Sequence, residues 1–260
     1  MGSKSTSRSA AVDVWGPGGG TTVLLCHGAG LSRTMWTPLR EYLPAPVRTI
    51  APDLPGHGAR ADRTFELAEA ADVVLEDLTS RADGDAVVVG HSLGGYVALE
   101  LARRAPERVS SLVLSGASAE YRGALAIKTR LASPLLRLGG SIEPVDGYFR
   151  RRTERRLRAL DLSDETVDEI LAGGVSLGAW GAGGRALIGY PSHEAVADLE
   201  RPVVLVNGSE DELNVEPAAW LANEHAHVRA ETIDGAGHAV PLERPRAFAE
   251  AVRSAIGERP

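Results

Sequence analysis

Short apolar runs rich in β-branched residues alternate along the chain with longer segments of helical pattern. The short runs predict strands and the longer segments predict helices. Strands are expected at Ala11–Trp15, Thr22–Cys26, Val47–Ala51, Ala86–Val89, Val109–Ser115, Pro202–Val206 and Arg229–Ile233. Helices are expected at Arg33–Leu43, Phe65–Arg81, Leu93–Arg103, Pro217–Glu224 and Pro241–Ile256. This alternation predicts an α/β fold, in which helices flank a mostly parallel central sheet.

One interval, residues 119–191, breaks the alternation. It contains no convincing strand, only helical stretches separated by the glycine pairs Gly139-Gly140, Gly173-Gly174 and Gly183-Gly184. We therefore expect an inserted all-helical cap subdomain at 119–191, a core made of 11–118 and 192–260, and a disordered tail at 1–10.

The charge of this interval differs from that of the rest of the chain. It carries 11 Lys or Arg against 9 Asp or Glu, whereas the remainder carries 17 against 26. The excess comes mainly from the arginines at 150–152, 155–156 and 158. Two interpretations stay open for them: a solvated helix face with acidic partners, or a lip that attracts anionic substrates to a pocket.

Composition narrows the classes of function. The chain has 260 residues, of which 43% are hydrophobic and 24% charged, as in an ordinary globular protein. The net charge of −7 argues against nucleic acid as a partner. No apolar run is long enough to span a membrane and residues 1–10 lack the apolar region of a secretory signal, so we expect a cytoplasmic protein without a membrane partner. The lone Cys26 excludes an intrachain disulfide.

The segment after the fourth predicted strand contains the pattern G-x-S-x-G as Gly90, Ser92 and Gly94. An apolar run leads into the pattern and a helical segment leads out, which is the context that a nucleophile elbow requires. The glycines permit a sharp turn in which larger side chains would collide. Such a turn lifts the Ser92 hydroxyl out of the sheet and leaves the Leu93 amide at the helix start facing a developing oxyanion.

A serine hydroxyl needs a base to remove its proton, and His238 is the leading candidate among seven histidines. It lies in a glycine-rich loop between a predicted strand and the last helix, where catalytic groups often lie. His27 and His57 are each followed by glycine and are expected to lock turns, and His91 is the variable residue of the elbow. The other histidines have no supporting pattern, and no metal site is expected: His193, His225 and His227.

Two carboxylates compete to orient the histidine. Asp211 follows a predicted strand at its carboxyl end, where α/β proteins build their sites, and Glu120 follows the preceding strand. Spacing alone does not decide between them. The chain order Ser92, Asp211, His238 is the order typical of this elbow class.

With these motifs in place, the chain resembles the α/β-hydrolase superfamily from about Val23 to Ile256. The segments that carry the resemblance are His27–Gly30, Asp53–Gly58, Gly90–Gly95, Gly208–Asp211 and Gly237-His238. The resemblance implies that Ser92 is the nucleophile, His238 the base and Asp211 the orienting acid. It also implies an oxyanion hole made of the amides of Ala29 and Leu93, and a helical cap after the sixth strand of the family.

The expected function is hydrolysis of a carboxylic ester, lactone or thioester of a small, largely apolar molecule through an acyl-enzyme on Ser92. Three alternatives stay open: C–C bond hydrolysis, perhydrolase or cofactor-free chemistry on the same triad, and a small-molecule receptor that retains the triad. No cofactor is expected, because the G-x-G-x-x-A match at 181–186 follows no adequate strand. Four residues are expected to line the substrate pocket: Gly30, Trp36, Tyr121 and Trp180. The oligomeric state and the physiological substrate cannot be predicted from the sequence.

Overall fold

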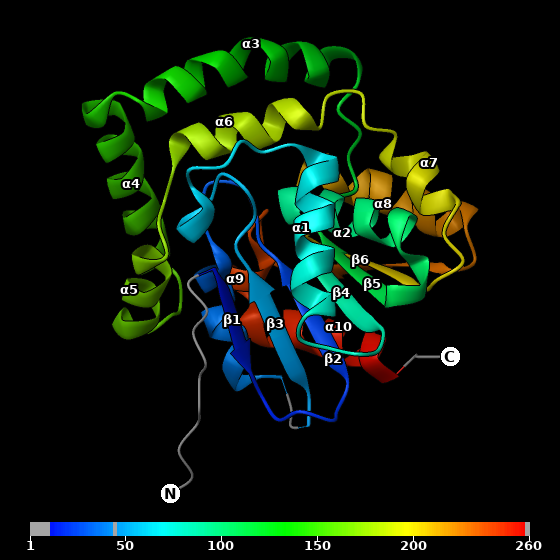
Figure 1. The fold of residues 1–260 in the computed structure, drawn as a ribbon. Coiled ribbons are helices and arrows are strands. Elements are labelled where there is room, and N and C mark those ends of the chain that lie inside the picture. Colours follow the sequence, from blue (N-terminus) through cyan, green and yellow to red (C-terminus); the bar gives the residue numbers. More distant parts are fainter. Residues whose placement is uncertain (1–10, 44–45, 258–260) are drawn as a thin grey trace, which may run out of the picture.

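The computed structural model describes residues 11–43 and 46–257, so the predicted tail at 1–10 lies outside the described residues. In this part of the chain seven strands form a sheet in the order β1-β3-β2-β4-β5-β6-β7 (Figure 1). The strands are β1 (Val12–Trp15), β2 (Thr22–Cys26), β3 (Arg48–Pro52), β4 (Ala86–His91), β5 (Val109–Ser115), β6 (Val203–Gly208) and β7 (Val228–Ile233). β1 pairs with β3 in antiparallel orientation, and the other neighbours are parallel. The predicted mostly parallel sheet is therefore confirmed.

Helices connect the strands and cover both faces of the sheet. The 3-10 helices are η1 (Arg33–Glu41), η2 (Gly58–Arg60) and η3 (Pro106–Arg108). The α-helices of the first half are α1 (Leu67–Thr79), α2 (Leu93–Arg104), α3 (Gly123–Gly140), α4 (Glu143–Arg158) and α5 (Asp164–Ala172). Those of the second half are α6 (Leu177–Ala186), α7 (Ser192–Ala197), α8 (Glu212–Glu224), α9 (Val240–Glu243) and α10 (Pro245–Gly257).

The alternation of side chains along each strand divides the core into two apolar layers. Val88 of β4 and Leu205 of β6 point into one layer, which they share with residues of α1, α2, α7 and α8. Val87 and Val204, one position away, point into the other layer with residues of η1, α9 and α10. Because successive residues of a strand face opposite sides, a sheet buried on both faces needs a continuous apolar run, as β4 has.

The helix predicted at Arg33–Leu43 is the 3-10 helix η1, and the largest differences in helix boundaries lie at α8 and at the last predicted helix. The helix predicted from Pro217 begins at Glu212, because the amides of Asn214 and Val215 already donate to the carbonyl of Asp211. The predicted last helix is broken into α9 and α10 at Arg244. Arg244 precedes a proline, which disfavours helical backbone at that position, and it has φ −140° and ψ 61°.

Between β5 and β6 the chain forms the helices α3 to α7. The described residues of this interval contain one isolated β-bridge, between Tyr121 and Ile188, and no strand. α6 lies between α3 and the rest of the molecule, and α3 runs along the outer edge (Figure 1). No helix in the described ranges combines the length and the apolar character needed to cross a bilayer.

Candidate active site

Ser92 lies at the turn between β4 and α2, where the backbone is strained. It has φ 50° and ψ −118° and is the non-glycine residue with positive φ among residues 11–43 and 46–257. A Cβ at Gly90 would lie 2.3 Å from the Gly94 oxygen, and a Cβ at Gly94 would lie 2.1 Å from the Cys26 oxygen. Larger residues at both positions are therefore excluded by backbone atoms, as the elbow motif predicts. Strain of this kind is typical of functional sites.

Three side chains from separate loops meet at this turn. The Ser92 Oγ lies 3.0 Å from Nε2 of His238, and Nδ1 of the same ring lies 2.8 Å from Oδ2 of Asp211. Asp211 directly precedes α8 after β6, and His238 lies in the loop between β7 and α9. The Asp211 side chain is buried, whereas that of His238 is half exposed. Both distances lie within hydrogen-bond range, so a proton can pass between serine and imidazole.

Asp211 is held by a second side chain that sequence reasoning did not identify. The amide nitrogen of Asn214 donates to both carboxylate oxygens of Asp211, at 3.1 and 3.0 Å. The Asn214 oxygen in turn accepts from the backbone amides of Ser118 and Ala119. Burial alone would raise the pKa of Asp211, but the hydrogen bond and the charge of His238 and the bonds from Asn214 lower it below its usual value. The carboxylate is thus kept ionised beside the imidazole.

Glu120, the rival carboxylate, has other partners. Its Oε1 accepts from the backbone amide of His193, and its Oε2 lies 3.1 Å from Arg122. The structure therefore brings Asp211, and not Glu120, to His238. The helical spacing of three residues between Asp211 and Asn214 could have pointed to Asn214, but the sequence analysis started this helix only at Pro217, whereas it starts at Glu212.

His91 is a second imidazole beside the reacting group, and the sequence alone did not suggest this position. Its ring centroid lies 5.1 Å from that of His238, and a Cβ at Gly28 would lie 2.9 Å from its Cδ2. Burial, and then the nearby charge of His238, lower the pKa of His91 to about 3. The ring is thus neutral at neutral pH and fills the space between His238 and the loop after β2.

Because the His91 ring is buried in its neutral form, we expect the free energy of unfolding to depend on pH. The unfolded chain protonates His91 near pH 6.5, whereas the folded chain does so only near 3, so stability is lost as pH falls between these values. Between pH 7 and 5 the free energy of unfolding should fall by about 2 kcal/mol more in the unaltered protein than in His91→Gln. Urea unfolding of both proteins at the two pH values measures this difference. Equal losses in the two proteins would show that His91 is not buried in its neutral form.

The two residues whose amides are predicted to stabilise an oxyanion, Ala29 and Leu93, have their side chains beside the same glycine of α6. Within the described residues neither the Ala29 nor the Leu93 amide donates to a protein acceptor. Leu93 is the first residue of α2, where amides point away from the helix without an internal partner. A Cβ built at Gly183 of α6 would lie 2.6 Å from the Leu93 side chain and 3.4 Å from the Ala29 Cβ. Both residues therefore pack against the same point of α6.

Gly30 and Trp180, two of the residues predicted to line the pocket, pack together at α6, whereas Tyr121 packs on Tyr96 of α2. Gly30, with φ 79°, contacts α6: its carbonyl accepts from the Ser176 amide, and a Cβ there would lie 3.4 Å from the Trp180 Cβ. Trp180 is half exposed and stacks on Phe149, with ring centroids 5.8 Å apart. Tyr121 packs edge to face on Tyr96 in a T-shaped pair and is partly buried.

Trp36 requires a correction. It is fully buried and stacks on Phe248 of α10, with ring centroids 6.2 Å apart, in the apolar layer of η1. This conformation leaves no surface of Trp36 for a substrate, so the structure places it in the core instead of the pocket. η1 follows the predicted oxyanion loop in the chain but turns its apolar face to the sheet, which sequence proximity does not reveal.

The other loop histidines hold turns, as their glycine neighbours predicted. His27 places Nδ1 at 2.9 Å from the Gly28 oxygen and accepts from the Leu54 amide through Nε2. His57 places Nδ1 at 2.9 Å from the Pro55 oxygen. In the described ranges no three His, Cys, Asp or Glu side chains are grouped so that they could hold a metal ion.

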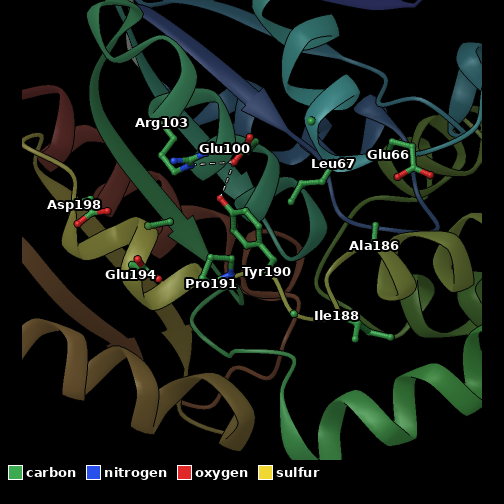
Figure 2. A pocket seen from close by; sticks show the side chains of 13 residues that line it. Glu66, Leu67, Glu100, Arg103, Ala186, Ile188, Tyr190, Pro191, Glu194 and Asp198 are labelled. Carbon is green, nitrogen blue, oxygen red and sulfur yellow. Dashed lines mark hydrogen bonds and ion pairs between the residues drawn. The ribbon is translucent and has the colours of Figure 1, made fainter.

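A hollow of about 570 Å³ is lined by residues of α1, α2, α7 and the loop before α7 (Figure 2). Glu100 lies at its wall and accepts from the hydroxyl of Tyr190 and from Nε of Arg103. Its lining includes none of the three side chains that meet at the elbow. It is therefore separate from the site at Ser92.

Comparison with known proteins gives a family match that includes Ser92, Asp211 and His238. The model of the "Alpha/beta hydrolase family" matches residues 23–251 of this chain. The chain belongs to this alpha/beta hydrolase family. The match spans the elbow and the loops that bear Asp211 and His238, so the resemblance inferred from the motifs is confirmed.

Curated relatives and solved structures agree with this family. A pimeloyl-[acyl-carrier protein] methyl ester esterase of Aromatoleum aromaticum is 34% identical over 90% of this chain and 97% of its own length. An enzyme of the same name from Neisseria meningitidis is 31% identical over 90% of this chain and 93% of its own. Among solved structures, a thermophilic esterase from Thermogutta terrifontis has a TM-score of 0.75 and 25% identity, covering 98% of this chain and 97% of its own.

Proposed function

We propose that this alpha/beta hydrolase is a carboxylic ester hydrolase that works through an acyl-enzyme on Ser92. The observation that carries the proposal is the line of contacts from the Ser92 Oγ through His238 to Asp211, with distances of 3.0 and 2.8 Å. The names of the relatives, which are methyl ester esterases, support the same reaction class.

In the proposed mechanism His238 removes the hydroxyl proton of Ser92 as the oxygen attacks the ester carbonyl. The Asp211 carboxylate stabilises the imidazolium that forms, and the amides of Ala29 and Leu93 bind the oxyanion. Loss of one such donor typically raises the barrier by about 2.7 to 4 kcal/mol. His238 then protonates the departing alkoxide, and water hydrolyses the acyl-enzyme with the same base.

We further propose that residues 119–191, which include helices α3 to α6, act as a cap above this centre, with Gly30, Trp180 and Phe149 at the edge of the acyl site. The contact between α6 and both proposed oxyanion residues supports this arrangement. Cytoplasmic location and the absence of a nucleic-acid partner stay predictions from the sequence.

A panel of nitrophenyl esters, lactones and thioesters tests the reaction class. We expect turnover of nitrophenyl acetate with saturation kinetics and release of the free acid. Tight binding of panel members without turnover would instead support the receptor alternative. Cleavage confined to C–C bonds next to a carbonyl would support the other hydrolytic alternative on the same residues.

The basic residues of α4 favour anionic esters within this class. Arg151 and Arg155 are exposed, and no carboxylate partner is found for either within the described residues. Arg150 and Arg158, by contrast, are paired with acidic side chains. Unpaired charge near the cap raises the local concentration of anions.

We predict that charge reversal at two arginines of α4, Arg151→Glu with Arg155→Glu, lowers the preference for acidic over neutral esters. The ratio of kcat/KM for a dicarboxylic half-ester to that for a neutral ester of equal length should fall about tenfold at low salt. Arg246→Glu, an exposed change on α10, serves as the control. An unchanged ratio in the double variant would contradict the proposal.

A further inference from the structure

The outer face of α3 exposes a row of aliphatic side chains to solvent. Ile127, Leu131, Leu135 and Leu138 are 61–71% exposed, and their spacing of four, four and three residues places them on one face of the helix. The opposite face, with the buried Ser133 and Gly139, packs toward the rest of the molecule. We call this row the α3 stripe. A contiguous exposed apolar face of this kind marks an interaction surface.

The surroundings of the α3 stripe are strongly basic. α3 itself carries Lys128, Arg130 and Arg137 and no acidic residue. At 3.6 residues per turn, Lys128 lies on one side of the stripe and the two arginines on the other. Residues 122–158 hold ten Lys or Arg against three Asp or Glu, a net charge of +7. Because the whole chain has a net charge of −7, the remaining residues carry −14. The stripe therefore fits an anionic partner.

The charge and the residue types of the α3 stripe distinguish between three possible partners: a second copy of this chain, another protein and a lipid bilayer. A second copy would bring equal positive charge against the same face, which opposes association. Energetically dominant protein–protein contacts are rich in Trp, Tyr and Arg and poor in Leu, whereas the stripe is wholly aliphatic. Aliphatic side chains flanked by Lys and Arg are the pattern of a helix that lies in the interface of an anionic bilayer.

We propose that the outer face of α3 binds the surface of an anionic lipid bilayer. The four aliphatic side chains enter the boundary between headgroups and acyl chains, and Lys128, Arg130 and Arg137 meet the anionic headgroups. The sequence predicted no membrane partner from the lack of a spanning segment, and a surface contact of this kind does not require one. α3 runs along the outer edge of the molecule, with no labelled element beyond it (Figure 1).

The position of α3 links this surface to the site at Ser92. α3 and α6 approach closely at glycines: a Cβ at Gly140 would lie 2.4 Å from the Gly178 nitrogen, and one at Gly181 would lie 2.8 Å from the Leu136 Cβ. α6 in turn contacts Leu93, next to the elbow serine. A bilayer bound at α3 therefore lies on the cap side of the centre, from which lipid-dissolved esters reach it.

Co-sedimentation with vesicles tests the proposal. The full chain should sediment with vesicles of phosphatidylcholine and phosphatidylglycerol, weakly with phosphatidylcholine alone, and less as salt rises. Leu131→Glu with Leu135→Glu should reduce the partition coefficient at least about tenfold. Lys128→Gln, Arg130→Gln and Arg137→Gln together should reduce it by about 100-fold or more, since each basic residue contributes independently.

Matched changes elsewhere on the surface serve as controls. Trp220→Gln removes a half-exposed apolar residue of α8, and Arg103→Gln with Arg246→Gln and Arg253→Gln removes three charges outside the cap. Both controls should sediment like the unaltered protein, and hydrolysis of nitrophenyl acetate reports that every variant folds. Equal sedimentation with neutral and anionic vesicles, or none with either, would overturn the proposal. So would a dimer, or capture of an acidic carrier protein, that depends on the stripe in a protein that binds no vesicles.

Discussion

Replacing Ser92 by alanine is expected to lower kcat for nitrophenyl acetate by about 10⁶-fold, because it removes the hydroxyl that contacts the imidazole proposed as the base. The Ser92 Oγ is the atom 3.0 Å from His238 Nε2. Alanine is smaller than serine and therefore adds no atoms beside the crowded positions Gly90 and Gly94. Steady-state kinetics at neutral pH measure the effect.

Ser141→Ala is the matched control for this prediction. Ser141 lies exposed at the end of α3, and its hydroxyl makes a long contact of 3.4 Å with the Arg137 carbonyl. Its kcat should stay within about twofold of the unaltered value, as for surface changes in general. If Ser92→Ala retained more than a hundredth of the activity, the nucleophile would lie elsewhere.

Replacing Asp211 by asparagine is expected to lower kcat by about 10⁴-fold while leaving the size of the side chain unchanged. Asp211 accepts from His238 and, through both oxygens, from Asn214. A neutral amide turns one of those acceptors into a donor, so either His238 loses its orienting bond or Asn214 faces another N–H group. The imidazolium formed during catalysis also loses its counter-charge.

Glu120→Gln separates this effect from a general loss of negative charge. Glu120 was the competing carboxylate in the sequence, and its contacts are with Arg122 and the His193 backbone. Its kcat should stay within about threefold of the unaltered protein. Comparable losses in the two variants would contradict the assignment of Asp211 as the orienting acid.

The strands and the elbow could be predicted because their signals are local. Gly90 and Gly94 flank Ser92 within five positions, and backbone collisions explain why both must be glycine. β2 and β5 begin and end at the predicted residues, since both are continuous apolar or small runs bounded by polar or glycine residues. The start of α8 depends on hydrogen bonds to the Asp211 carbonyl, and the break at Arg244 depends on the proline that follows it. Helix propensity alone does not predict either position.

The parts of the site that sequence reasoning missed depend on contacts between distant segments. The chain order already favoured Asp211 over Glu120, but Asn214, which joins Asp211 to the backbone amides of Ser118 and Ala119, was not identified. His91 contacts His238 across 147 positions of sequence. Trp36 follows the loop of Ala29 in the chain, yet the rotation of η1 turns it into the core. The roles of the Ala29 and Leu93 amides stay predictions until a transition-state analogue is bound.

The most direct test of the account is the reaction with a fluorophosphonate, whose phosphorus forms a covalent bond with an activated serine oxygen as fluoride leaves. We predict one phosphonyl group per chain, located by peptide mass spectrometry on Ser92, and a labelling rate that falls at least about 10³-fold in His238→Ala. Labelling of another residue, or an equal rate without His238, would contradict the proposed transfer of the Ser92 proton to that imidazole.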